Sequence, residues 1–318
     1  MRRLLPVLLL VGLLAPAQAH AGNRLFEKSP NLDIARRVQA LLLHAGVPVV
    51  MTRTSDRTTS LESRTTLANG RRVDAFISLH NNASPSRSAN WSEVYHQLSG
   101  GGSRTLANMI RGRLATNLGQ TAYLKTRRGD HGDYYWQLRH TSMPAVIVES
   151  AFISNRRQAR LLATSAAYRQ KIAQSVYEGI MAYQRTLRRA STPPEFAAET
   201  RVTVPAVPPP ESVRGRAINS HIVRLTWTPV GGLVDGPVRV YRDGVPIGEA
   251  PLGQTVFEDV WAAPGQSYRY ELRTAVKPSD LAASLESSPA VVGVRTPPIV
   301  VCLDPGHGGR DPGATGSY

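Results

Sequence analysis

The stretch IVVCLDPGHGG, residues 299–309, decides the fold of this 318-residue chain. Its five apolar residues, 299–303, predict a buried β-strand, and three glycines then surround His307. Glycine lets a backbone and a ligand approach closely. A histidine just beyond the carboxyl end of a parallel strand lies where α/β sheets build their sites. The stretch therefore predicts a sheet strand that presents His307 to a site.

The segments upstream predict the rest of such a sheet. Apolar runs indicate strands at 47–51, 73–79 and 145–149, with a weaker one at 93–96. Apolar residues at helical spacing predict helices over 31–45, 60–69 and 106–118 and a last helix ending near residue 188. Strands that alternate with helices indicate an α/β domain, with a mostly parallel sheet and helices on both faces.

Two of these strands also carry chemical groups at their carboxyl ends. His80 follows the strand at 73–79, and Glu149 ends the strand at 145–149, while Glu27 precedes the first helix. A lone histidine or glutamate in such a place is commonly structural, so each residue alone is a weak signal. Two imidazoles and one carboxylate together form a catalytic zinc set with one position left for water. A further carboxylate then takes the proton from that water.

The arrangement of motifs resembles the zinc-dependent N-acetylmuramoyl-L-alanine amidases of the Amidase_3 type. The resemblance covers 23–187 and 299–318 and rests on DPGHGG at 304–309, DPGA at 311–314, EK at 27–28, NL at 31–32, TR at 52–53 with Asp56, Leu61, Arg64, AN at 68–69, SLHNN at 78–82, MPA at 143–145 and FISN at 152–155. It implies that His307, Glu27 and His80 bind Zn²⁺ and that Glu149 is the catalytic carboxylate. The implied reaction cleaves the amide between N-acetylmuramic acid and L-alanine of the peptidoglycan stem peptide.

The order of the motifs departs from that family. The glycine-histidine segment normally comes first, whereas here it comes last, and Glu27 begins where that segment would continue. The sequence therefore predicts a circularly permuted amidase domain made of 22–187 and 297–318. A truncated second copy of the domain, or a wrongly joined reading frame, is the alternative; either would leave the first part without one strand and one zinc ligand.

Between these two amidase segments the composition changes. Prolines predict an extended linker over 188–212, and alternating strands at 213–296 predict an all-β sandwich. The LTW at 225–227, VYRDG at 240–244 and YRY at 268–270 resemble a fibronectin type III domain. We expect a spacer or a docking module for a protein or wall partner, with Trp227 and Trp261 packed in its core rather than stacked on sugars.

The first residues predict export. Arg2 and Arg3 precede an eleven-residue apolar run, 4–14, and small residues near Ala19 offer a cleavage site, so 1–21 form a signal peptide. A buried N-terminal helix is the alternative. The run is too short to span a bilayer, and no other stretch is apolar enough. We expect a protein of the periplasm or extracellular cell wall without stable membrane insertion after cleavage.

The net charge of +15 suggests an anionic partner. Residues 22–187 hold 23 Lys and Arg against 10 Asp and Glu, and residues 190–298 hold 10 against 11, so the charge lies on the expected amidase part. Peptidoglycan fits this charge, although a solvated arginine-rich surface is the simpler alternative. The export signal argues against nucleic acid as the partner. A catalytically inactive wall-binding adaptor is the competing function, and the presence of all four site residues argues against it.

Overall fold

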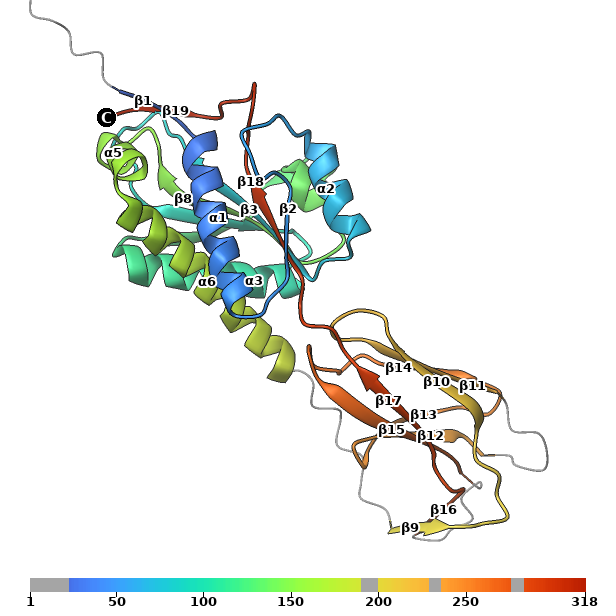
Figure 1. Ribbon diagram of the computed structural model, residues 1–318. Coiled ribbons are helices and arrows are strands. Elements are labelled where there is room, and N and C mark those ends of the chain that lie inside the picture. Colours follow the sequence, from blue (N-terminus) through green and yellow to red (C-terminus); the bar gives the residue numbers. More distant parts are fainter. Residues whose placement is uncertain (1–22, 190–199, 229–235, 276–282) are drawn as a thin grey trace, which may run out of the picture.

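The computed structural model describes residues 23–189, 200–228, 236–275 and 283–318, which form an α/β domain and a separate β-sandwich (Figure 1). The expected signal peptide, 1–21, lies outside the described residues. Within the described residues, no helix is both long and apolar enough to span a membrane.

The α/β domain is built on a six-stranded sheet. Its order is β2 (Val49–Met51), β18 (Val301–Pro305), β3 (Ala75–Asn82), β8 (Ala145–Phe152), β4 (Ser92–His96) and β5 (Ala122–Lys125). Four of the five neighbouring pairs are parallel, and β4 runs antiparallel to β8. The expected α/β class is confirmed, with a mixed sheet.

Helices cover both faces of this sheet. On one face lie α1 (Lys28–His44), α3 (Gly101–Leu118) and α6 (Ala166–Arg189), whose apolar side chains share one core with Ile77, Val148 and Leu303. On the other lie α2 (Leu61–Gly70) and the short α4 (Trp136–Arg139), packed around Phe76 and Cys302. The remaining elements are α5 (Arg156–Thr164), the hairpin of β6 (Arg128–Gly129) and β7 (Gly132–Asp133), and the pair of β1 (Arg24–Phe26) with β19 (Thr315–Ser317).

Strand β18 lies inside the sheet, although it comes from the last segment of the sequence. Val301 pairs with Val49 of β2 on one side and with Ala75 of β3 on the other, and both pairings are parallel. Every residue of β18 is buried. Burial of an aliphatic side chain contributes about 1.5–3 kcal/mol, so Val301 and Leu303 tie this strand firmly into the domain. Figure 1 shows it entering from the β-sandwich.

The β-sandwich packs two antiparallel sheets. One contains β10 (Glu211–Ala217), β11 (Val223–Thr228) and β14 (Val256–Asp259); the other contains β13 (Val245–Ala250), β12 (Val238–Arg242), β15 (Ser267–Thr274) and β17 (Ala290–Arg295). Trp227 is buried in the core between them, as expected, whereas Trp261 is half-buried. Asp243 and Gly244 both have positive φ, which suits the tight hairpin turn predicted there.

The expected linker over 188–212 is partly wrong. Helix α6 continues to Arg189, β9 (Thr200–Thr203) pairs with β16 (Ala283–Glu286), and β10 already begins at Glu211. The pairing of β9 with β16 depends on backbone groups far apart in sequence, which proline content does not reveal. Residues 190–199 lie outside the described part of the chain. The sequence also missed β5, α4, α5 and the β6–β7 hairpin, several of which are too short to show a period.

Asp74, just before β3, links the two domains. Its carboxylate accepts hydrogen bonds from the backbone N of Val300 at 2.7 Å and from the Ser220 hydroxyl, and His221 Nδ1 lies 3.6 Å away. The backbone of Asp74 also donates to the carbonyl of Val300 at 2.8 Å. The chain therefore enters β18 through a fixed polar contact with the sandwich loop 218–222.

A chain that ends at Thr296 is expected to misfold. It would leave β2 without its neighbour and expose the edge of β3, and exposed strand edges promote aggregation. Light scattering and circular dichroism, with the full chain as control, should show aggregates or lost structure. A monomeric, folded truncation would contradict the role assigned to β18.

Candidate active site

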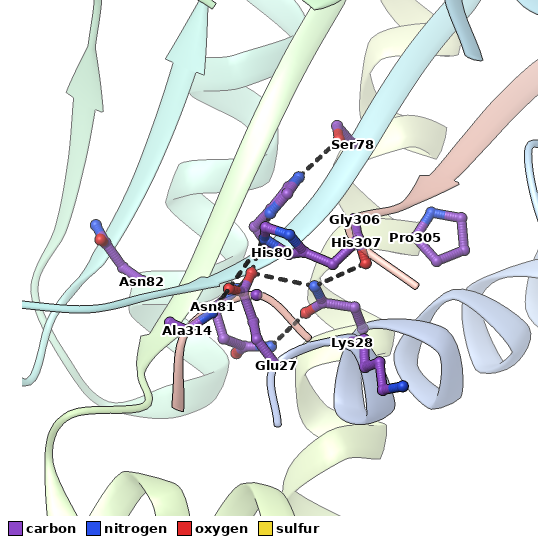
Figure 2. A network of polar contacts seen from close by, with 12 residues as sticks. Glu27, Lys28, Ser78, His80, Asn81, Asn82, Pro305, Gly306, His307 and Ala314 are labelled. Carbon is purple, nitrogen blue, oxygen red and sulfur yellow. Dashed lines mark hydrogen bonds and ion pairs between the residues drawn. The ribbon is translucent and has the colours of Figure 1, made fainter. Parts of the chain in front are cut away.

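Three side chains from distant parts of the chain meet at the carboxyl ends of β18 and β3 (Figure 2). Glu27 precedes α1, His80 lies on β3 and His307 follows β18. Glu27 Oε1 is 3.0 Å from His80 Nδ1, and Glu27 Oε2 is 3.1 Å from His307 Nε2. One donor atom from each residue lies within 4.8 Å of the others. The geometry thus gathers the three residues that the sequence put forward.

The outer nitrogen of each imidazole is held by another side chain. Asp311 Oδ2 lies 2.8 Å from His307 Nδ1, and Ser78 Oγ lies 3.1 Å from His80 Nε2. Such outer contacts fix the ring orientation and leave the inner nitrogen for a ligand. His307 Nε2 and His80 Nδ1 are therefore the atoms that face the centre of the cluster.

The cluster is strongly coupled electrostatically. Burial alone would raise the pKa of Glu27, but the hydrogen bonds with His307 and His80 hold it well below its usual range. Burial lowers the pKa of His307, yet Glu27 and Asp311 outweigh it and raise that pKa to about 9. The pKa of His80 is also raised, because Glu27 outweighs burial. Glu27 therefore favours the protonated form of both imidazoles.

Glu149 lies beside this cluster on the next strand. It pairs with His80 across the β3–β8 ladder, so both side chains project from the same face of the sheet. Its Oε2 atom is buried and has no hydrogen-bond partner among the described residues. Burial raises the pKa of Glu149 to about 7. The nearby charge of His80 lowers this pKa, and the negative charges of Glu27 and Glu93 raise it. A carboxyl group with this pKa accepts and returns protons near neutral pH.

Two buried arginines hold the loop that carries His307. Arg64 donates to the Asp304 carboxylate, to the carbonyl of Pro305 at 2.8 Å and to the carbonyl of His307 at 2.7 Å. Arg53 donates to the carbonyls of Pro305 at 2.9 Å and Gly306 at 3.0 Å. Removing one partner of a buried ion pair typically costs 3–5 kcal/mol. The loop is therefore fixed by α2 and by the segment after β2.

Close packing explains two glycines of the site. A Cβ atom on Gly306 would overlap the ring of His80, and one on Gly313, whose φ is +67°, would overlap His307. His307 itself has a φ of 61°, which an L-residue rarely adopts. The glycines let the two imidazoles approach each other, with ring centroids 5.0 Å apart.

The sequence missed the supporting residues. It identified Glu27, His80, Glu149 and His307, but it gave no role to Asp311, Asp304 or Arg64. Asp311 stands four residues after His307, beyond a glycine turn, and this spacing was the available signal. The contact between Asp304 and Arg64 spans 240 positions and becomes visible only in the fold.

The donor set fits a divalent transition metal. Two histidines and one glutamate form a known catalytic zinc set, and they would leave one coordination position open. Their inner atoms converge, their outer atoms are held, and the partnerless Glu149 Oε2 lies alongside. These residues are thus able to hold zinc together with a water molecule next to Glu149.

Comparisons with known proteins identify the family of the chain. The family model for N-acetylmuramoyl-L-alanine amidase (Amidase_3) matches residues 12–182. N-acetylmuramoyl-L-alanine amidase LytC of Bacillus subtilis (strain 168) is 39% identical over 167 residues, which cover 52% of this chain and 32% of LytC. The germination-specific N-acetylmuramoyl-L-alanine amidase of the same strain is 30% identical over 182 residues, covering 53% of this chain and 75% of that protein.

Among solved structures, the catalytic domain of the amidase CwlV from Bacillus (Paenibacillus) polymyxa var. colistinus is 29% identical, with a TM-score of 0.45, covering 50% of this chain and 85% of that one. The chain spans about a third of the length of LytC. The family match covers more than half of the 318 residues and leaves out 299–318. The chain belongs to the N-acetylmuramoyl-L-alanine amidase family, Amidase_3.

Proposed function

We propose that this chain is a zinc-dependent peptidoglycan hydrolase that cleaves the amide between N-acetylmuramic acid and L-alanine of the stem peptide. The observation that carries this proposal is the convergence of Glu27, His80 and His307 beside Glu149, in a chain of the amidase family. Its relatives include proteins named "probable cell wall amidase", such as LytH of Staphylococcus epidermidis, which is 32% identical over 167 residues. The basic character of 22–187 suits an anionic wall.

Glu27, His80 and His307 would hold the metal. Zinc, when bound in such a site, polarises the carbonyl of the scissile amide and lowers the pKa of a water molecule. Asp311 and Ser78 keep the imidazoles in orientation, and Asn31 together with the backbone N of Asn81 and Ala314 holds the Glu27 carboxylate at 2.9–3.1 Å. The site would thus enter the reaction already organised.

Glu149 would move the protons. As a carboxylate it takes a proton from the attacking water, and as a carboxylic acid it gives that proton to the leaving amine of L-alanine. The buried Oε2 atom of Glu149 has no hydrogen-bond partner among the described residues, so it is available to accept a proton. The raised pKa of Glu149 suits both proton transfers. Its place beside His80 on the neighbouring strand puts it next to the reacting centre.

The domain would be a circularly permuted form of the family fold. In support, β18 fills an interior position of the sheet, and β19 pairs with β1 in antiparallel register. The backbone N of Tyr318 donates to the carbonyl of Asn23 at 3.2 Å, so the segments that the family order would join lie side by side. A truncated second copy would not need to fill the sheet of the first.

The surrounding segments complete the proposal. Residues 1–21 would direct export, which places the enzyme in the periplasm or at the extracellular wall. The sandwich would be a fibronectin type III-like spacer or docking module, since its tryptophan Trp227 is taken up by the core. An inactive adaptor is disfavoured because all four residues with chemical roles are present and gathered.

Product analysis tests this function directly. Purified peptidoglycan treated with the zinc-loaded chain should release stem peptides with a free amino-terminal L-alanine, detectable by mass spectrometry, and leave the glycan strands uncut. Release of new reducing sugar ends, or no product with fully loaded protein, would refute the assignment.

Replacement of Glu149 by Gln should abolish turnover while zinc stays bound. Gln keeps the shape of the side chain but cannot accept a proton, and general-base steps contribute about 10²–10⁴-fold. Peptide release and metal content by mass spectrometry measure the two effects, with Glu62→Gln on the exposed surface of α2 as the matched control. A zinc-loaded Glu149→Gln chain with the parental rate would make Glu149 merely structural, and a metal-free one would make it a ligand.

Zinc affinity should rise with pH between about 6 and 9. His307 has a pKa of about 9 in the metal-free site, so below that pH the metal must displace its proton, and above it this competition ends. For each proton that the metal must displace, zinc affinity rises by up to about tenfold per pH unit below the pKa of that imidazole. Competition with a chromogenic chelator measures this, and His44→Asn, on an exposed site, should not change the slope. A flat affinity across this range would show that the imidazoles are not ligands.

A further inference from the structure

A row of side chains extends from the candidate metal cluster to the edge of the sheet. Cross-strand pairs link His80 on β3, Glu149 on β8, Glu93 on β4 and Tyr123 on β5. Directly paired residues project from the same face of a sheet, so these four side chains line one surface. The proposed reaction gives a role to His80 and Glu149 but none to Glu93 and Tyr123.

Glu93 is the anchor of this surface and is itself fully occupied. It is buried, and it accepts hydrogen bonds from Trp91 Nε1 at 2.9 Å, Asn82 Nδ2 at 3.1 Å and the Tyr95 hydroxyl at 2.8 Å. Lys125 Nζ lies 3.8 Å from its Oε1 atom. Glu93 therefore orients its neighbours, and a ligand must bind to the residues that lie further out.

Arg127 lies between β5 and β6, at the base of the β6–β7 hairpin. The backbone N of Tyr134 donates to the Arg127 carbonyl at 2.8 Å, which places the two residues opposite each other. The guanidinium lies 3.8 Å from the centroid of the Tyr134 ring, and that ring packs edge-to-face on Tyr135 with centroids 5.2 Å apart. The Tyr134 ring therefore orients the guanidinium, while the Arg127 side chain stays exposed to solvent.

Tyr134 and Tyr135 lie between Arg127 and the strand that carries Glu93. The Tyr135 ring packs edge-to-face on Tyr95, with centroids 5.0 Å apart, and Tyr95 in turn donates to Glu93 beside Glu149. The guanidinium thus lies a few side chains from Glu149. Within the described ranges, no carboxylate pairs with Arg127, in contrast to Lys125, which lies near Glu93.

We propose that Arg127, stacked on Tyr134, is the binding site for a carboxylate of the stem peptide. This rests on the proposed function. A guanidinium offers two parallel donors that match a carboxylate, and an oriented one loses less entropy on binding. Because Arg127 covers one face of the Tyr134 ring, that face is closed to sugar stacking, which favours the peptide over the glycan as ligand.

Two synthetic muramoyl peptides test the site. They are identical except that the residue after L-alanine carries a free carboxylate or the corresponding carboxamide, and the peptide end is capped as an amide. Arg127→Gln should raise KM for the carboxylate substrate about 10- to 100-fold with little change in kcat, since hydrogen bonds to charged groups have this strength. KM for the carboxamide should stay within about twofold, and Arg104→Gln, on exposed α3 at the other face, should change neither.

The conservative variant distinguishes binding from mere support of the hairpin. Arg127→Lys keeps the charge without the planar fork, so it should recover part of the preference for the carboxylate. Equal losses on both substrates in Arg127→Gln, or no loss on either, would overturn the proposal.

If the parental chain cleaves neither substrate, the proposed function fails, but the pair remains a test of the site. Calorimetry with the uncleaved compounds should then show tighter binding of the carboxylate form that Arg127→Gln removes. Equal binding of both forms to the parental chain would overturn the proposal.

Discussion

The rest of the structure depends on the buried contact between the Asp304 carboxylate and Arg64. This carboxylate is fully buried, and it accepts hydrogen bonds from Arg64, from Thr52 Oγ1 at 2.6 Å and from Ser78 Oγ at 2.6 Å. Burial alone would raise the pKa of Asp304, but Arg64 and the two hydroxyls hold it below the ordinary value. One charge thus joins β18 to α2, to the end of β2 and to β3. A buried carboxylate without such partners would destabilise the folded chain. The elements that carry these partners must therefore pack next to β18.

This constraint also builds the site. The same Arg64 that neutralises Asp304 donates to the backbone of His307, and Ser78 contacts both Asp304 and His80. Strand register then sets His80 beside Glu149, and Glu149 beside Glu93. The groups proposed to react therefore lie on β3 and β8, on the loop held by Arg64 and just before α1, and a site held in this way needs little reorganisation during a reaction.

The sequence revealed those features that follow from local patterns. Apolar runs predicted the strands that carry His80 and Glu149. Parallel strands present their carboxyl ends at one edge of the sheet, so these two side chains could be expected to meet there. The glycines around His307 likewise marked a close approach. The motif order further indicated that the last strand belongs with the first residues, and β18 does lie between β2 and β3.

Features that depend on pairing between distant segments were hidden. Asp304 before Pro305 has the pattern of a turn, and its contact with Arg64 exists only in the folded chain. Glu93 lies on a weakly patterned strand whose antiparallel pairing with β8 places it next to Glu149. Arg127 is one of 38 basic residues, and only the hairpin sets it against Tyr134. The pairing of β9, which lies within the expected linker, with β16 was missed for the same reason.

In the proposed site, the last segment of the sequence would supply one metal ligand, His307, and the first segment the other two. X-ray absorption at the zinc edge of the loaded full chain, compared with His307→Ala, measures this directly. We expect two imidazole ligands in the parental chain and one in the variant, together with weaker zinc binding. An unchanged number of imidazoles in His307→Ala would contradict this assignment.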